Sequence, residues 1–552
     1  MLAFAQGSTI ERPMTRGPAA ATFAIALIVA VACNSTAPPV SPTPTPSPSA
    51  TSSASLSATQ SPTDTAPPSS GSPTPTASPT GSAEPSATVT PTPYLQSVEM
   101  PFVPVVSFWS TRESISLAEL QSGMTAGEVL VADDDLAPLG LPPTAGTTPI
   151  SARDIRLSVR EQDRVGVLRA TEVDQSVRAL GIGEVKLFGN DRLEDIAQWP
   201  LLATVQSTQA WDQSATWTLV AVGDMHFDRL VRTAIEASGE RSYPFDGGTA
   251  EVSGMRCCSF YNYPYPLVRR TGNAGLVREL LSGADVTIGN LESGVLEDAP
   301  HHADPTSFTF TTDSTWMTDL AANGFDMLST ANNHSNDAGQ RGMRTAIEAI
   351  AAAGMQSAGS GFGNDVFAPA LLEANGTMLA IIACTGVRVP NAVQPDPDRV
   401  VVMSCNDSNV TRVIRETRDQ ADVVMVYPHW GREYMASVPP RASQRDQATE
   451  WIAAGADLIV GHHSHFPGGI EDIDGKLVMY SLGNFIFDQD FSQATMMGLI
   501  PEMTFNGADL KQVWIHPTLI FDNAQPNLAD PDTDGQFAYD LVRQGSEGLL
   551  PY

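Results

Sequence analysis

The sequence predicts an α/β protein whose functional residues lie at the ends of strands. From Trp217 onward, short apolar runs of strand length alternate with stretches of helical periodicity. Three of the nine histidines of the chain, His462, His463 and His465, lie in one loop directly after the apolar run that ends at Gly461. Because α/β folds keep their binding sites at the carboxyl ends of strands, we expect this loop to form part of a functional site.

The N-terminal segment has the pattern of an export signal. Arg12 and Arg16 precede the apolar run 19–33, which is shorter than the roughly 20 residues of a membrane-spanning helix. The end of this run, Ala-Val-Ala-Cys, resembles a bacterial lipobox and predicts lipidation of Cys33. We therefore expect residues 1–33 to be a signal peptide and the protein to be an extracytoplasmic lipoprotein of a bacterial membrane or cell surface. Ordinary secretion and an uncleaved anchor stay open.

Residues 34–93 have the composition of a disordered linker. They are almost entirely Ser, Thr, Pro and Ala, and their charged residues are Asp64 and Glu84. Such a segment cannot bury a core. In a polyproline conformation of about 3.1 Å per residue it would span roughly 190 Å. The composition predicts a stalk that carries the folded part away from the membrane.

Residues 94–215 predict a smaller α/β domain. Ser116 and Glu119 form a capping box that opens a helix, and Ser151 opens a second helix. The expected strands are Phe102–Trp109, Glu128–Ala132, Arg164–Ala170 and Glu184–Phe188. This alternation favours a parallel sheet of about four strands, like one lobe of a solute-binding protein. A packing or substrate-presenting role and a ligand-binding role both stay open.

Charge restricts the partners of this protein. The formal net charge of the 552 residues is -31 at pH 7. Nucleic acid and anionic membrane surfaces are therefore excluded as main partners, and a polyanionic substrate would need local help from metal ions.

Polar side chains follow the predicted strands of the C-terminal part. Asp224 and His226 follow the strand 218–222, and Asn290 and Glu292 follow the strand 285–288. A carboxylate and an imidazole at a strand end can reach one cation, and the carboxylate can bridge to a second. Taken singly, each motif is also compatible with turn chemistry or an exposed loop.

Three further strand ends carry the same kinds of side chain. Asn333, His334 and Asp337 follow the strand 325–330, for which helix capping is an alternative explanation. His429, Arg432 and Glu433 follow the strand 422–427, and Asn484 follows the strand 477–480. A series of strand ends that all carry polar side chains of these kinds is much less expected by chance than any single one of them.

The motifs together resemble a known family. GlyAspMetHis, AsnLeuGlu, AsnAsnHisSerAsnAsp, HisTrpGlyArgGlu, GlyHisHisSerHis and SerLeuGlyAsnPhe occur in this order between Trp217 and about Asp522. They resemble the CapA family of poly-γ-glutamate capsule proteins, whose domain is similar to calcineurin-like metallophosphoesterases. The resemblance implies a four-layer α/β/β/α sandwich over residues 216–528, followed by a C-terminal tail at 529–552.

The resemblance also implies roles for single residues. His334 and Asp337 would be catalytic, with His334 acting on the leaving group, and His462 would be a neighbour of the metals without binding them. The implied metal ligands are Asp224, His226, Glu292, Asn333, His429, His463 and His465, and the implied substrate-binding residues are Asn290, Arg432, Glu433 and Asn484. Two features depart from the family pattern: Glu292 replaces a bridging Asp, and many relatives lack the histidine at position 226.

The expected function is hydrolysis assisted by two divalent metal ions. Ligation by nitrogen and oxygen without thiolate suits Mn, Fe or Zn. The substrate would be a phosphate ester or an amide of a cell-surface polymer, and the capsule-synthesis machinery is a candidate partner. The alternative is a non-catalytic envelope protein that binds or guides an anionic polymer such as poly-γ-glutamate.

Four cysteines remain besides Cys33. In an exported protein, disulfides are expected more often than metal ligation. Among the pairings that the sequence leaves open, Cys384 with Cys405 is favoured.

Overall fold

The computed structural model describes residues 94–143, 150–162, 164–259, 261–389, 395–406, 408–434 and 439–552. The predicted signal peptide, the lipidation site Cys33 and the predicted stalk lie outside these residues. The described residues all belong to one compact unit. No helix within them has the length and hydrophobicity needed to cross a membrane.

The larger of the two main sheets holds ten strands of the described chain. Its order is β10 (Tyr265–Gly272), β9 (Thr249–Arg256), β27 (Gln525–Leu528), β26 (Asp509–Phe521), β25 (Met497–Asn506), β8 (Thr216–Met225), β11 (Val286–Leu291), β14 (Met327–Ser329) and β15 (Gln356–Ala358), with β24 (Asn484–Ile486) also paired to β8. The strands β8, β11, β14 and β15 are parallel, whereas β25 and β26 continue the sheet in antiparallel pairs.

The second main sheet has six strands. Its order is β17 (Ala370–Ala374), β18 (Thr377–Thr385), β20 (Val423–His429), β21 (Leu458–Val460), β23 (Lys476–Met479) and β22 (Ile470–Ile473). Its four central strands are parallel. Each expected strand from residue 218 to residue 480 overlaps a strand of one of these sheets.

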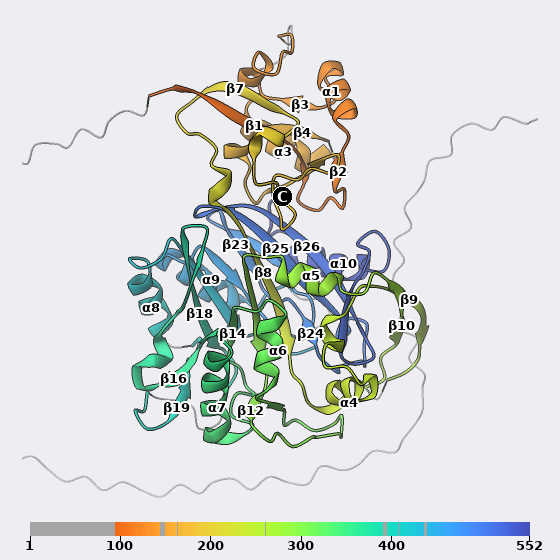
Figure 1. The fold of residues 1–552 in the computed structure, drawn as a ribbon, viewed down its shortest axis with the longest axis vertical. Helices are drawn as coiled ribbons and strands as arrows, with labels where there is room; N and C mark the ends of the chain where they lie inside the picture. Colours follow the sequence, from red (N-terminus) through yellow and green to blue (C-terminus); the bar gives the residue numbers. More distant parts are fainter. Residues whose placement is uncertain are drawn as a thin grey trace, which may run out of the picture. The chain divides into compact units, whose positions relative to one another are not determined.

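The two sheets face each other and helices cover their outer faces (Figure 1). Alternate residues of β8 explain the layering, because Leu219 lies in the core between the sheets while Val220 packs against helices. The helices on the large sheet are α4 (Arg229–Ser238), α5 (Leu276–Ser282), α6 (Trp316–Ala322) and α7 (Gly339–Ala352), and those on the second sheet are α8 (Asn409–Thr417) and α9 (Ala442–Ala454). The predicted α/β/β/α sandwich is confirmed.

Short strand pairs and a disulfide complete this part of the chain. The pairs are β12 (Gly294–Leu296) with β13 (Thr311–Asp313), and β16 (Ser360–Phe362) with β19 (Val400–Val402). Cys384 and Cys405 are bonded, as favoured from the sequence, and the adjacent Cys257 and Cys258 are also bonded.

Residues 94–215 form a mostly antiparallel sheet, so the prediction of a parallel one is wrong. The long strand β1 (Gln96–Ser107) runs antiparallel to β4, β5 and β7, and the one parallel pair of this sheet is β3 with β4. The elements are β3 (Leu130–Val131), β4 (Gly166–Arg169), β5 (Val177–Ala179), β7 (Leu202–Ser207), the pair β2 (Ser114–Ile115) and β6 (Gly181–Ile182), and the helices α1 (Leu117–Ala126), α2 (Asp133–Leu136) and α3 (Ala152–Gln162).

Local signals in residues 94–215 predicted the structure better than the alternation of elements predicted its topology. The Ser116 side chain accepts a hydrogen bond from the backbone N–H of Glu119, as the capping box predicts. The apolar run 184–188, expected to be a strand, is not one. Leu187 and Phe188 are buried in irregular backbone, because burial alone produces an apolar run without requiring an extended ladder.

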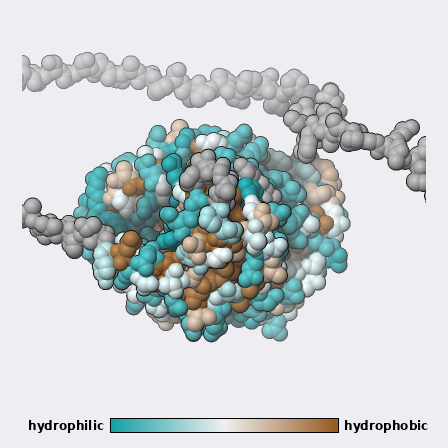
Figure 2. All heavy atoms as spheres, turned by 90° about the horizontal axis from the view of Figure 1, so that it is seen from above, coloured by the Kyte–Doolittle hydropathy of each residue, from teal (hydrophilic) through white to brown (hydrophobic). Residues whose placement is uncertain are grey.

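The segment 529–552 is part of the folded unit and not a loose tail. It contains α10 (Gln536–Ser546), whose Ala538 and Val542 are buried in the core between the sheets. The hydroxyl of Tyr539 donates to the carbonyl of Ile515 on β26 at 2.8 Å. The face of the molecule seen in Figure 2 is mainly hydrophilic, with hydrophobic side chains gathered near its middle, in keeping with the acidic composition.

Candidate metal centre

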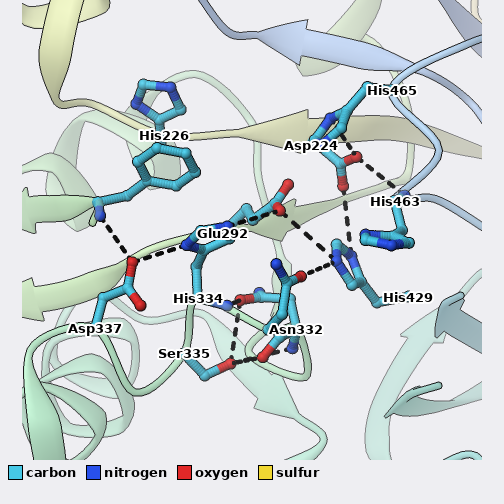
Figure 3. Close-up of polar contacts among 12 residues, drawn as sticks. Asp224, His226, Glu292, Asn332, His334, Ser335, Asp337, His429, His463 and His465 are labelled. Atoms are coloured by element: carbon cyan, nitrogen blue, oxygen red, sulfur yellow. Dashed lines mark hydrogen bonds and ion pairs between the residues drawn. The ribbon is translucent and has the colours of Figure 1, made fainter. Parts of the chain in front are cut away.

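The predicted ligands converge because parallel strands of both sheets end at the same place. Asp224 lies at the end of β8, Glu292 follows β11, and His429 is the last residue of β20. His463 and His465 lie in the loop that follows β21. These five side chains lie side by side in Figure 3. The structure therefore brings together residues that are far apart in the sequence.

Distances between donor atoms confirm that these side chains share one space. Oδ1 of Asp224 lies 3.7 Å from Nδ1 of His429, and Nε2 of His429 lies 3.7 Å from Oε1 of Glu292. Four overlapping groups each have donor atoms within 4.8 Å of one another: Asp224, His429 and His462; Glu292, His429 and His463; Glu433, His463 and His465; Asp224, Glu292 and His465. The groups share members, so they form one continuous cluster of possible metal donors among the described residues.

The residues present fit a metal site. Glu292 is completely buried, and neither of its carboxylate oxygens has a hydrogen-bond partner among the described residues. The same holds for Nδ1 of His463. Buried polar atoms are normally paired. A divalent cation would supply the missing partner of the Glu292 carboxylate, which shares a donor group with His429 and His463.

The electrostatics agree with this interpretation. Burial, together with the charges of Asp224 and Glu433, raises the pKa of Glu292 well above its usual value. Burial also holds the pKa of His429 well below its usual value and lowers that of His463 to about 3. The imidazoles are therefore neutral and keep lone pairs for a metal. Burial acts against ionisation of Asp224 too, but the hydrogen bond and charge of His462 lower its pKa.

Asn333 and His334 extend the cluster from β14. Oδ1 of Asn333 lies 2.6 Å from Nε2 of His429, beside the other predicted ligands. Nδ1 of His334 lies 2.7 Å from Oδ2 of Asp337, which leaves Nε2 facing Glu292 at 3.7 Å. The predicted catalytic pair is thus in contact at the edge of the cluster.

His226 is not brought to the cluster (Figure 3). Its Nδ1 accepts a hydrogen bond from the backbone N–H of Asp228 at 3.2 Å, and its Nε2 lies 3.3 Å from Oδ1 of Asp488. Phe310 is stacked between His226 and His334. Both ring nitrogens of His226 are therefore engaged, so this residue offers no lone pair to a metal ion in the cluster. It packs against Phe310, which in turn stacks on His334.

Two residues predicted to bind substrate instead contact predicted metal ligands. Asn290 is completely buried, and its Nδ2 donates to Oδ1 of Asp224 at 2.8 Å. Asn484 is 1% exposed, and its Oδ1 lies 2.8 Å from Nδ1 of His465. Arg432 and Glu433 are exposed at the rim, where contact with a substrate is open to them.

Other residues of the site were not found from the sequence. Asn332 donates to the backbone carbonyl of Leu291 at 2.8 Å and to Asn290 at 3.1 Å, so it ties β14 to β11. Asp488 pairs with both His226 and Arg229. His462, expected to be a neighbour, lies with Nδ1 2.8 Å from Nδ1 of His429 and inside one donor group. Asn332 stands in the AsnAsnHis motif, which was a usable signal, whereas Asp488 stands outside every motif.

The histidine loop has an uncommon backbone. His463 and His465 have φ angles of 97° and 58°, in the left-handed region that non-glycine residues rarely adopt. Strained backbone of this kind persists where the surroundings determine it, and it is concentrated at functional sites.

Comparison with known proteins agrees with the motifs. Residues 218–489 match the family described as bacterial capsule synthesis protein PGA_cap. The resemblance to the CapA family is confirmed. The match contains every predicted metal ligand and catalytic residue of this chain, so the CapA-like segment and the cluster coincide.

Curated relatives cover the same segment. The PGA biosynthesis protein CapA of Bacillus subtilis is 29% identical over 235 residues, which are 41% of this chain and 59% of that protein. The capsule biosynthesis protein CapA of Bacillus anthracis is 31% identical over 245 residues, 42% of this chain and 59% of that protein. The chain thus spans less than two thirds of the length of these CapA proteins.

Solved structures give weaker likenesses. A putative 5'-nucleotidase from Staphylococcus aureus is 10% identical, with a TM-score of 0.34 over 59% of this chain and 58% of that one. The NAD nucleotidase of Haemophilus influenzae is 12% identical, with a TM-score of 0.31 over 59% of this chain and 62% of that one. At such TM-scores these likenesses carry no argument about the CapA-like segment.

Proposed function

We propose that this protein is a CapA-like, metal-dependent hydrolase of the bacterial envelope that acts on a phosphate ester or an amide of a cell-surface polymer. The observation that carries this proposal is the buried carboxylate of Glu292, which has no hydrogen-bond partner within the described residues and lies among the imidazoles of His429 and His463. Two divalent ions, Mn, Fe or Zn, suit these nitrogen and oxygen donors.

The residues divide the work of hydrolysis between them. Asp224, Glu292, His429, His463 and His465 would hold the cations, with Asn333 at His429. When bound, two divalent cations activate water and stabilise the negative charge that develops on the reacting group.

His334 would serve the leaving group. Asp337 accepts from Nδ1 of His334 and fixes the orientation of the ring. A protonated His334 can then donate from Nε2, which faces the cluster, to the departing oxygen or nitrogen. Phe310, stacked on the His334 ring at a centroid distance of 4.1 Å, keeps the ring in this place.

We also propose that the protein is a lipoprotein anchored through Cys33. The support is the apolar run 19–33, its lipobox-like end and the Ser/Thr/Pro-rich residues 34–93 that follow. An anchor and a stalk would place the CapA-like segment outside the membrane, where capsule polymers are handled. Metabolic labelling with a palmitate analogue should mark the wild type and not Cys33→Ala.

Turnover by metal-loaded protein tests the hydrolase. Purified protein with Mn²⁺ is assayed on aryl phosphates, phosphodiesters and γ-glutamyl peptides. We expect turnover of at least one class and a loss of about 10²-fold to 10⁴-fold in His334→Ala, with metal content unchanged. His516→Gln, outside the cluster, should retain wild-type activity.

A second candidate function is favoured by the names of the relatives, which describe biosynthesis and not degradation. In that case the cluster would bind metal and help to guide an anionic polymer. Full metal loading without turnover of any of the three substrate classes would favour this second function and contradict the first.

A further inference from the structure

Tyr434 closes a ring of contacts around His465. The Tyr434 and His465 rings are stacked, with centroids 5.5 Å apart and an interplanar angle of 21°. From the other side, Nδ1 of His465 lies 2.8 Å from Oδ1 of Asn484, and Nδ2 of Asn484 donates to Oε1 of Gln489 at 3.1 Å. Nε2 of Gln489 then donates to the hydroxyl of Tyr434 at 2.8 Å. Tyr434 therefore contacts His465 directly and through two amides.

The direction of these hydrogen bonds is determined at Asn484. Its Nδ2 also reaches the backbone carbonyl of Thr495 at 2.9 Å, and a carbonyl can only accept. The amide oxygen of Asn484 must then face His465, and Oδ2 of Asp224 faces the same Nδ1 at 3.4 Å. With two acceptors around it, Nδ1 of His465 carries the proton. The lone pair is on Nε2, the nitrogen left free to bind a metal.

The orientation of Asn484 also determines the hydrogen bond between Gln489 and Tyr434. Because the oxygen of Gln489 accepts from Asn484, its nitrogen faces Tyr434 and donates to the phenol oxygen. The phenol has one proton and does not use it in this bond. Among the described residues the hydroxyl has no second partner. Tyr434 thus has an unused donor next to a predicted metal ligand.

The backbone of Tyr434 is strained and is fixed to the histidine loop. Its φ angle is 56°, in the left-handed region, and its N–H donates to the carbonyl of Ser464 at 3.0 Å, between His463 and His465. Phe491 packs edge-on against the ring at 5.2 Å. The residue is nevertheless 38% exposed, so a bound molecule can reach it.

We propose that Tyr434 positions the His465 ligand and donates a hydrogen bond to an oxygen of the substrate held at the cluster. The positioning role requires only that the cluster bind metal. The donor role rests on the proposed hydrolase function. The two parts are tested by different readouts, so that failure of one is distinguishable from failure of the other.

Metal affinity tests the positioning role. Tyr434→Phe keeps the stacked ring, and Mn²⁺ affinity measured by chelator competition should stay within about twofold of wild type. Tyr434→Leu removes the stack and Asn484→Leu removes the acceptor of Nδ1, so each should weaken Mn²⁺ binding by about 10-fold to 100-fold. Circular dichroism identifies a variant that does not fold; Gln489→Met, which leaves both rings in place, then serves instead and should weaken binding several-fold. Wild-type affinity in all folded variants would overturn the positioning role.

Turnover tests the donor role. Tyr434→Phe should lower kcat by about 100-fold, as loss of a donor to a developing negative charge does, with a small change in KM. Tyr263→Phe, a tyrosine 51% exposed on the turn between β9 and β10, is the matched control and should behave as wild type. A Tyr434→Phe enzyme with kcat within twofold of wild type would overturn the donor role. Absence of turnover in the wild type would instead overturn the proposed hydrolase, and the donor role with it.

Discussion

Glu292 is a buried carboxylate whose charge a bound cation would compensate. It is fully buried, and its two oxygens have no hydrogen-bond partner in the described part of the chain. An ionised carboxylate in such surroundings is destabilising unless a positive charge compensates it. The carboxylate that would bind the cation therefore lowers the stability of the protein when no cation is bound.

We predict that Glu292→Gln separates the two effects. The amide cannot ionise, and burial already opposes ionisation of Glu292 by raising its pKa, so the melting temperature of the chelator-treated variant should equal or exceed that of chelator-treated wild type. Added Mn²⁺ should raise the melting temperature of the wild type strongly and that of the variant much less, because binding to the native state stabilises it. Equal metal-induced shifts in both proteins would contradict the role of Glu292 as a ligand.

Asp337 should act only through His334. Its Oδ2 accepts from Nδ1 of His334 and from the backbone N–H of Phe310 at 2.8 Å. In Asp337→Asn the ring is less well oriented, so kcat should fall by about 10-fold to 100-fold, less than in His334→Ala. Steady-state kinetics with measured metal content checks this; an unchanged kcat would leave Asp337 without a catalytic role.

At the residue scale, most of the residues predicted to meet do lie together, but His226 lies apart from them. Asp224, Glu292 and His429 could be found because a polar residue at a strand end has a defined place in an α/β fold. His226 could not be told from a ligand, since its rotamer depends on Asp488, which is more than 250 positions away. Likewise, Asn484 faces His465 and not the solvent because of its bond to Thr495.

At the element scale, glycines let the strand ends approach each other. A Cβ at Gly461 would overlap Nε1 of Trp430 and the carbonyl of Tyr480, and a Cβ at Gly223 would overlap the carbonyl of Gly483. These glycines immediately precede His462 and Asp224. Close packing of backbone against backbone thus sets the positions of the ligand-bearing turns.

We predict that Gly461→Ala destabilises the protein and loosens the centre. Overpacking of this kind costs about 1–3 kcal/mol of unfolding free energy, and Mn²⁺ affinity should fall because the histidine loop shifts. The matched control is Gly254→Ala on β9, where an added Cβ meets only Cδ1 of Leu267 at 4.0 Å. Urea denaturation and metal titration of both variants make the comparison; equal behaviour would contradict the packing argument.

Elements were predicted best where a local signal determines them. The helix after Ser116 follows from a hydrogen bond within three residues, and the buried strands of the two sheets follow from apolar runs. The direction of β1 relative to its neighbours is a non-local property, which composition does not encode. The predicted parallel sheet in residues 94–215 was wrong for this reason.

At the scale of the whole molecule, residues 94–215 are joined to the large sheet by polar contacts to the buried Glu502 and Thr504. Glu502 on β25 is 6% exposed and accepts from the backbone N–H of Asn190 at 2.6 Å. Its other oxygen lies 2.9 Å from Nε2 of His516. Thr504 accepts from the N–H of Gly189 at 3.0 Å. No sequence motif predicted these contacts, because the residues that they join are more than 300 positions apart.

We predict a pH-dependent contribution from Glu502. Burial raises its pKa, but the hydrogen bond and charge of His516 lower it further, so the folded-state pKa lies below the ordinary 4.5. Its stabilisation is complete above that ordinary value and is lost as pH falls through the folded-state pKa. Glu502→Gln should cost about 1–3 kcal/mol at pH 7, and this difference from wild type should shrink below pH 4.5. Urea denaturation between pH 7 and pH 3 measures it; a pH-independent difference would contradict the assignment.

The central claim is that strand ends from both sheets hold two cations between them. Anomalous diffraction from crystals grown with Mn²⁺ tests it most directly. We predict two adjacent peaks, within bonding distance of Asp224, Glu292, His429, His463 and His465. Full-occupancy Mn²⁺ bound elsewhere, or no anomalous peak among these side chains at saturating Mn²⁺, would contradict the claim.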